Sequence, residues 1–290
     1  MRHGKVRKSK KRAPLWYYAA MILLVGVFVG SIGYLGSYFL GAREQAAQFE
    51  DLAALVEAAR GAIPNEQEQG VAADQEGNPL DGDFEMMVTE PEDHFHNEDG
   101  ILHEYAQLYA MNPDMAGWIS IEGTKINYPV MHTPDRKDHY LKRNFSGEYS
   151  SWGCLYVREE CDPEAPSDNV TIYGHNMKDG SMFAGLHAYT SREFWESHRY
   201  IRFDTVKKHH IYEIFAVFKT TATQDVGFEY HAFINAADGQ SFDAFIAGCM
   251  SLSLYGTDLI PEYGDKIICL STCEYSQPDG RLVVAAVRID

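Results

Sequence analysis

Apolar and charged residues form three blocks along this chain. Residues 1–12 carry seven Lys or Arg, and residues 13–42 then run for 30 residues without a charged side chain. A helix of this length can cross a bilayer, and the Trp and Tyr residues near its ends are typical of membrane interfaces. We therefore expect a transmembrane anchor, with the basic tail in the cytoplasm and the rest of the chain outside the cell. A cleaved signal peptide is the alternative, but its apolar part is usually about half as long.

The second block, residues 43–99, joins the anchor to the rest of the chain. Residues 43–59 have helix-forming composition, whereas residues 61–99 hold twelve acidic residues, no Lys or Arg, and several Pro and Gly. This pattern predicts a short helix followed by an acidic, flexible stalk. Its histidines have no neighbouring Cys and do not match the spacing of a closed metal site, so we expect no bound metal. These are His94, His96 and, just beyond the block, His103.

The third block, residues 100–290, has the pattern of a globular domain. An amphipathic helix at 101–111 stops at Asn112-Pro113, and short apolar runs separated by turn residues follow. These predict eight strands, at 118–121, 126–130, 153–157, 170–173, 200–203, 210–219, 266–272 and 282–289. Helices are expected at 181–189, 191–198 and 241–254. The fold class is therefore mainly β with added helices, as a closed or nearly closed eight-stranded barrel.

Charge and cysteine content limit the partners and the disulfide bonds that this chain can have. Outside the basic tail the chain has 18 Lys or Arg against 42 Asp or Glu, which disfavours nucleic acid and anionic lipid as partners. Cys154 and Cys161 could pair across a turn or could be small buried side chains. Cys269 and Cys273 cannot pair in an extended strand, because four residues span about 13 Å.

The candidate chemistry lies at strand ends. Cys273 closes one predicted strand and Arg281 opens the next, across a Pro-Asp-Gly turn signal. Pairing these strands would place a thiol beside a guanidinium, which favours thiolate and can hold an oxyanion. His175 follows another apolar strand and can exchange a proton with a thiol.

These residues lie in segments that resemble class B sortases. The segments are NPDMAGWISI (112–121), INYPV (126–130), YLKRNF (140–145), YGHNMKDGSMF (173–183) and LSTCE (270–274), followed by Arg281. The resemblance covers residues 100–290, which would form the catalytic domain. It implies the eight-stranded sortase barrel, with an inserted helix before the strand that bears the cysteine.

The resemblance also implies an activity and a set of site residues. Sortases cleave a C-terminal sorting signal, of NPxTx or xPxTG type, after Thr and pass the acyl group to an amine on lipid II or peptidoglycan, or on a pilin lysine. No cofactor is implied. By position, the catalytic residues would be His175, Cys273 and Arg281. The residues that line the substrate groove would be Leu141, Thr220, Thr221, Thr223, Ser271, Thr272 and Glu274. Tyr173 and Asn176 would orient the histidine.

Two departures leave the recognition motif open. Lys137 stands where some class B members carry Asn, and Ala222 interrupts the threonine run. The residue types do not decide whether water or an amine resolves the thioester, so a cysteine peptidase remains an alternative. A third reading is a non-catalytic anchored binding module, which would tolerate Cys273→Ala. The remaining histidines, including His187, are interpreted as surface or packing residues.

Overall fold

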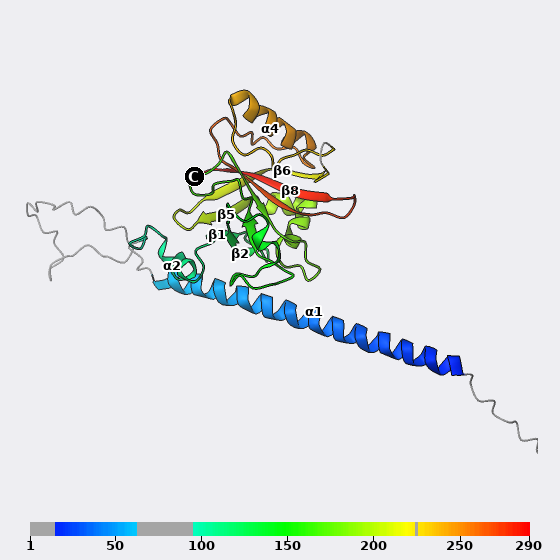
Figure 1. Ribbon diagram of the computed structural model, residues 1–290. Helices are drawn as coiled ribbons and strands as arrows, with labels where there is room; N and C mark the ends of the chain where they lie inside the picture. Colours follow the sequence, from blue (N-terminus) through cyan, green and yellow to red (C-terminus); the bar gives the residue numbers. More distant parts are fainter. Residues whose placement is uncertain (1–14, 63–94, 224–225) are drawn as a thin grey trace, which may run out of the picture. The chain divides into compact units, whose positions relative to one another are not determined.

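The computed structural model describes residues 15–62, 95–223 and 226–290 (Figure 1). The basic tail and most of the predicted acidic stalk lie outside these residues. The chain divides into two compact units, Met1–Ala46 and Ala47–Asp290.

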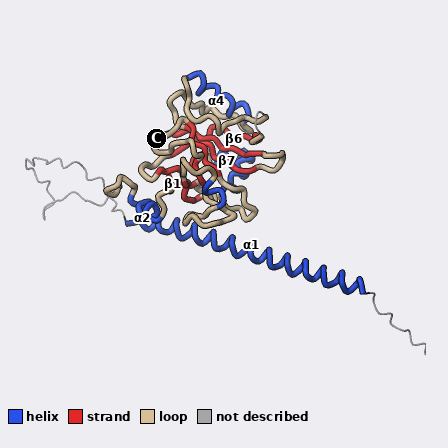
Figure 2. The backbone as a smooth tube through the Cα atoms, in the orientation of Figure 1, coloured by secondary structure: helices blue, strands red, loops and turns tan. Residues whose placement is uncertain are grey.

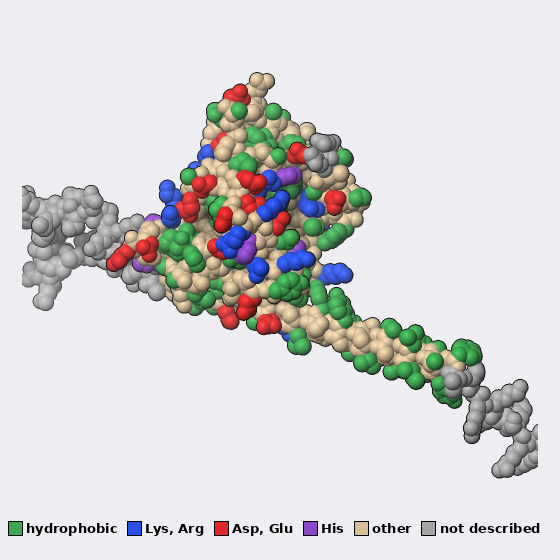
Figure 3. Space-filling model, viewed as in Figure 1, with side chains coloured by type: hydrophobic (Ala, Val, Ile, Leu, Met, Phe, Trp, Pro, Cys, Tyr) green, Lys and Arg blue, Asp and Glu red, His purple; other side chains and the backbone are tan. Residues whose placement is uncertain are grey.

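The helix α1, Leu15–Ala62, begins with the uncharged block and continues beyond it. Hydrophobic side chains cover its N-terminal part, where they are exposed (Figure 3). The segment Trp16–Gly61 contains a stretch of 18 residues with a mean hydropathy of 2.1, and no residue of this stretch is buried in the protein. By length and composition, α1 is able to cross a membrane.

The C-terminal part of α1, residues 47–62, belongs to the larger unit. Phe49, Leu52 and Val56 recur at three- and four-residue spacing, which places them on one helix face, and all three are buried. The Phe49 ring meets Tyr128 edge to face, with 5.1 Å between centroids. This segment is therefore packed as part of the hydrophobic core.

A buried carboxylate connects four segments near the end of α1. Asp204 accepts hydrogen bonds from Tyr105 (2.6 Å) and Arg202 (2.8 Å), and it lies 3.0 Å from His209 Nδ1 and 3.5 Å from Arg60. Burial opposes ionisation here, but the hydrogen bonds from His209 and Tyr105 and the charge of Arg202 hold the Asp204 pKa below its ordinary value.

Eight strands form a closed barrel, as predicted, with ends that differ from the expected ones by a few residues. They are β1 (Met115–Ser120), β2 (Asn127–Met131), β3 (Leu155–Val157), β4 (Asn169–Tyr173), β5 (Tyr200–Thr205), β6 (Ile211–Thr221), β7 (Ile267–Cys273) and β8 (Gly280–Arg288). Their order around the barrel is β1-β2-β3-β4-β7-β8-β6-β5. Figure 2 shows the strands in red, gathered together and surrounded by loops and helices. The pairs β2/β3 and β4/β7 are parallel and the others antiparallel. Inward-facing aliphatic side chains such as Ile172, Leu270 and Val284 fill the interior.

Within residues 95–223 and 226–290, five short helices lie around the barrel. They are α2 (His103–Met111), η2 (His139–Lys142), η3 (Phe183–Thr190), α3 (Arg192–Ser197) and α4 (Gly239–Leu252). The segment η3 is a 3-10 helix rather than an ordinary α-helix. Its buried residues Phe183, Leu186 and Tyr189 recur every third position, which matches three residues per turn.

The helix α4 is the insertion between β6 and β7 that the resemblance implied. Asp238 caps its N-terminus, since its side chain accepts a hydrogen bond from the Ser241 backbone while the Ser241 side chain reaches back. Its buried side chains, Phe242 and Cys249 among them, form a second apolar cluster with residues of β6, β7 and β8. This packing covers one outer face of the barrel.

Candidate active site

The strand register brings Cys273 and Arg281 directly opposite each other. The Glu274 N–H donates to the Gly280 carbonyl at 2.9 Å, so the next pair inward, Cys273 and Arg281, exchanges no hydrogen bonds between its backbones. Side chains of such pairs lie on one face and approach most closely. The thiol and the guanidinium are therefore neighbours at one end of the barrel.

The strand β4 brings His175 to the same end. It runs parallel to β7, with Tyr173 beside Ser271. The contacts continue past the strand, because the Gly174 N–H donates to the Ser271 carbonyl at 3.1 Å and the Thr272 hydroxyl donates to the Gly174 carbonyl at 2.8 Å. His175, one residue further on, is thus held beside the end of β7.

A backbone carbonyl fixes the half-buried His175 ring. Its Nε2 lies 2.7 Å from the carbonyl oxygen of Leu141. A carbonyl oxygen can only accept, so Nε2 carries a proton in this contact. The other ring nitrogen, Nδ1, is then the one left to take up or release a proton.

One cavity of about 350 Å³ contains all three groups. Seven of the site residues expected from the sequence line it: Leu141, Tyr173, His175, Ser271, Thr272, Cys273 and Arg281. Among the five thiols, only Cys273 is partly exposed. Burial raises the pKa of each of the other four thiols, so they are inert at neutral pH. Cys154 and Cys161 are free rather than paired.

The other expected site residues lie outside the lining of this cavity, in the segments around it. The Thr220 hydroxyl accepts from the Phe228 N–H at 2.9 Å, and the Thr221 hydroxyl donates to the Pro278 carbonyl at 3.1 Å. Thr223 joins them through its backbone N–H, 3.1 Å from the Thr221 hydroxyl. Their contacts therefore connect the β6 end to the adjacent loops.

Glu274, next to the nucleophile candidate, also contacts residues of its own loop and of β6. It contacts Lys219 at 3.2 Å and accepts from the Ser276 backbone at 3.0 Å. The Ser276 hydrogen bonds and the charge of Lys219 hold the Glu274 pKa below its usual range.

The cavity also has a polar wall that the sequence analysis missed. Tyr156, Arg158 and Glu159 contribute from β3 and the residues after it, and His231 from the loop before α4. The Tyr156 hydroxyl donates to Asp138 at 2.9 Å. Burial, followed by the charge of Arg158, lowers the pKa of His231. The alternation of residues along β3 predicts which side chains share a face. It does not predict that β3 pairs with β4, which is what brings this face to the cavity.

A second histidine lies close to the nucleophile candidate. His187, which the sequence suggested to be a surface or packing residue, has its Nε2 3.1 Å from the Cys273 carbonyl oxygen. Asn176 donates to the same oxygen at 3.0 Å and lies 2.8 Å from the His187 ring.

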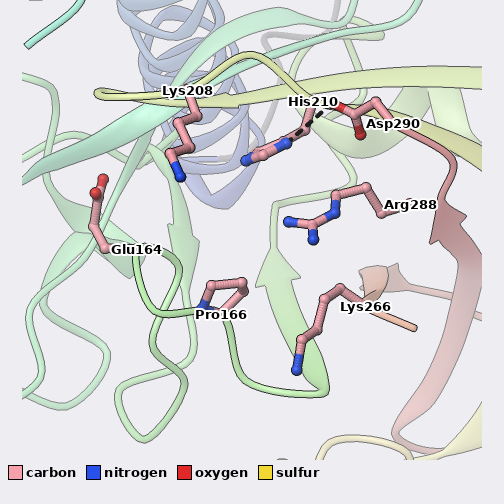
Figure 4. Close-up of a pocket in the computed structure, with 7 residues that line it drawn as sticks. All are labelled: Glu164, Pro166, Lys208, His210, Lys266, Arg288 and Asp290. Atoms are coloured by element: carbon pink, nitrogen blue, oxygen red, sulfur yellow. Dashed lines mark hydrogen bonds and ion pairs between the residues drawn. The ribbon is translucent and has the colours of Figure 1, made fainter. Parts of the chain in front are cut away.

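A different cavity, of about 380 Å³, opens at the other end of the barrel (Figure 4). Lys266 precedes β7 and Arg288 ends β8, so this cavity is a strand length away from Cys273. Figure 4 shows Lys208, His210 and Arg288 around the same space. Its seven lining residues include no Cys, Ser or Thr, so they supply no hydroxyl or thiol nucleophile.

Comparison with known proteins identifies the family. The family model for the sortase domain matches residues 119–289, which include every strand from β2 to β8 and all three groups. The chain belongs to the sortase family. Sortases are cysteine transpeptidases, and the inserted α4 agrees with the class B resemblance.

Individual relatives support the same class. Sortase B of Listeria monocytogenes is 33% identical over 186 residues, covering 63% of this chain and 73% of the relative. Sortase B of Staphylococcus aureus is 28% identical over 205 residues, covering 70% and 79%. The crystal structure of a Bacillus anthracis protein described as similar to sortase B superposes with a TM-score of 0.65 at 27% identity, covering 85% of this chain and 96% of that one. The predicted fold and class B assignment are confirmed.

Proposed function

We propose that this sortase is anchored in the membrane by α1, cleaves a C-terminal sorting signal after Thr, and transfers the released surface protein to a cell-wall amine. The observation that carries this proposal is the single cavity lined by Cys273, His175 and Arg281. A thiol, a proton carrier and a fixed cation are the groups that acyl transfer through a thioester requires.

The first half of the reaction makes the thioester. Cys273 gives its thiol proton to His175, and its sulfur attacks the carbonyl carbon of the Thr in the signal. The electron pair of the carbonyl moves to its oxygen, where Arg281 stabilises the negative charge. When the carbonyl reforms, the C–N bond breaks and the departing amine takes the proton from His175.

The second half transfers the acyl group. The acceptor amine attacks the thioester carbon and gives a proton to His175. The C–S bond then breaks, and the sulfur of Cys273 leaves and recovers its proton. The acceptor is an amine of lipid II or peptidoglycan, and a pilin lysine would use the same steps. None of these steps needs a metal or an organic cofactor.

The walls of the cavity suit a short extended peptide. Leu141 and Tyr173 supply apolar surface, and the Ser271 and Thr272 side chains contribute from β7. We assign signals of NPxTx or xPxTG type to this groove, in line with the family. Thr220, Thr221, Thr223 and Glu274 would support its rim, because they hold the adjacent loops.

The anchor would orient the enzyme. Seven basic residues precede the apolar stretch of α1, and such flanks stay in the cytoplasm. The catalytic unit would then lie on the outer face, where sorting signals and cell-wall precursors meet. Protease digestion of intact cells expressing a chain with an N-terminal epitope tests this, since the tail should be protected and the catalytic unit cleaved.

A peptide panel tests the activity. The full chain in detergent is incubated with quenched peptides that contain NPxTx or xPxTG signals, with and without an amine acceptor, beside Cys273→Ala. Cleavage after Thr with a peptide–amine product that requires Cys273 is expected. Hydrolysis that ignores the acceptor would identify a peptidase instead, and turnover by Cys273→Ala would exclude the thioester route.

A further inference from the structure

The carbonyl oxygen of Cys273 is held by side chains instead of a neighbouring strand. In the parallel ladder between β4 and β7, the last backbone bond joins the Gly174 N–H to Ser271. The next carbonyl on β7 that faces β4 is that of Cys273, but β4 has already ended at Tyr173 and supplies no backbone donor to it. The side chains of Asn176 and His187 approach this oxygen instead, at 3.0 and 3.1 Å.

The two side chains also contact each other, because Asn176 Nδ2 and His187 Nε2 are 2.8 Å apart. A carbonyl oxygen has two lone pairs and can accept from both. If Nε2 is protonated, the ring donates to the Cys273 carbonyl; if it is not, the ring accepts from the Asn176 amide. In either state His187 is part of one network with the backbone of Cys273.

The scaffold keeps the His187 ring in place. It is half-buried on η3, and its neighbour Leu186 is completely buried. The segment η3 packs against both β7 and β8, the strands that carry Cys273 and Arg281. A side chain on such a support can hold a reacting group in a fixed position.

We propose that His187 is a positioning residue for Cys273, acting together with Asn176. Their hydrogen bonds fix the peptide plane after Cys273, and thereby the backbone from which the thiol side chain projects into the cavity that His175 also lines. This matters at the end of a strand, where the ladder no longer restrains the backbone, since a displacement of about 1 Å can lower a rate by about a hundredfold. The inference rests on the proposed function of Cys273 as the nucleophile.

Alkylation of Cys273 by iodoacetamide measures its positioning and reactivity without any sorting peptide, because the other four thiols are buried. The full chain is compared with His187→Ala, His187→Gln and Asn176→Ala. The control is His198→Ala, another half-buried histidine, whose ring contacts Phe194 and Ser197. Turnover of the sorting peptide and thermal unfolding are measured alongside.

His187→Ala is expected to lower the alkylation rate and kcat by about five- to tenfold, with KM unchanged. His187→Gln should recover most of the loss, because its amide can donate to the same carbonyl. Asn176→Ala should also lose activity, and the double variant should lose less than the product of the two single losses. His198→Ala should leave both rates unchanged.

An alkylation rate for His187→Ala equal to that of the parent would overturn the proposal. So would a loss in His187→Gln as large as in His187→Ala, or an equal loss in His198→Ala. If the parent enzyme also transfers no peptide to the amine, while the alkylation rate still depends on His187, the proposed transpeptidation fails and the positioning role stands.

Discussion

Replacing Arg281 by Ala separates a chemical role from a structural one. Among the residues that the structure describes, its guanidinium donates only to nearby backbone, the Asp279 and Gly280 carbonyls at 3.2 and 3.0 Å. Within residues 95–223 and 226–290, no carboxylate lies within ion-pair distance of it. The side chain is half-buried, so its removal should cost less than about 1 kcal/mol of unfolding free energy. The melting temperature should fall by no more than about 2–4 °C.

The effect on catalysis should be far larger. Removing one donor to a developing oxyanion lowers rates by about 100- to 1,000-fold, which is about 2.7–4 kcal/mol. The kcat/KM of Arg281→Lys should lie between that of Arg281→Ala and that of the parent, because an ammonium keeps the charge but loses the planar fork of donors. The assay is kcat/KM on a quenched sorting peptide, with thermal unfolding of the same samples.

Arg288→Ala is the matched control, since it removes the same residue type from the opposite end of the same strand, β8. It should leave kcat/KM unchanged. A loss below tenfold for Arg281→Ala would refute the oxyanion role. An equal loss in Arg288→Ala would also refute it. A fall in melting temperature well beyond about 4 °C would instead contradict the small structural cost of removing the side chain.

Three further outcomes follow from buried groups. Iodoacetamide at neutral pH should add one adduct to the native protein and none to Cys273→Ala, as mass spectrometry would show; a second adduct on native protein would contradict the burial of the other thiols. Thr272→Val should cost about 1 kcal/mol in urea unfolding, because the half-buried Gly174 carbonyl loses the hydrogen bond from the buried Thr272 side chain, and an unchanged midpoint would argue against that contact. Asp204→Asn should cost about 2–3 kcal/mol at neutral pH. Because the pKa of Asp204 is lower in the folded state, the stabilisation from this carboxylate is complete above its unfolded pKa of 3.8 and is lost as pH falls through its folded pKa. The difference in unfolding free energy between Asp204→Asn and the parent should therefore shrink below about pH 4. A difference that stays constant with pH would exclude this linkage.

The barrel was predictable because its signals are local. Apolar runs bounded by Gly, Pro and Asp give strands, and the Pro-Asp-Gly turn between β7 and β8 implies a hairpin that puts Cys273 opposite Arg281. The inserted α4 was expected from the resemblance, and its amphipathic pattern marks its buried face.

What the sequence could not supply depends on contacts between distant segments. The carbonyl of Leu141 orients His175, and a backbone carbonyl leaves no signal in the residue type. The residues of α1 that enter the core have clear helical spacing, yet their partner Tyr128 cannot be read from it. The contact between His187 and the Cys273 carbonyl also joins distant segments, and the residue spacing along η3 does not reveal it.

Intact mass spectrometry of the acid-quenched enzyme can detect the acyl group on Cys273 itself. The full chain is mixed with a sorting peptide in the absence of an amine acceptor and stopped within a turnover. A mass increase equal to the part of the peptide up to and including Thr is expected, located on Cys273 and released by hydroxylamine as a thioester. Cleaved peptide without this adduct, or an adduct on another residue, would rule out a thioester on Cys273.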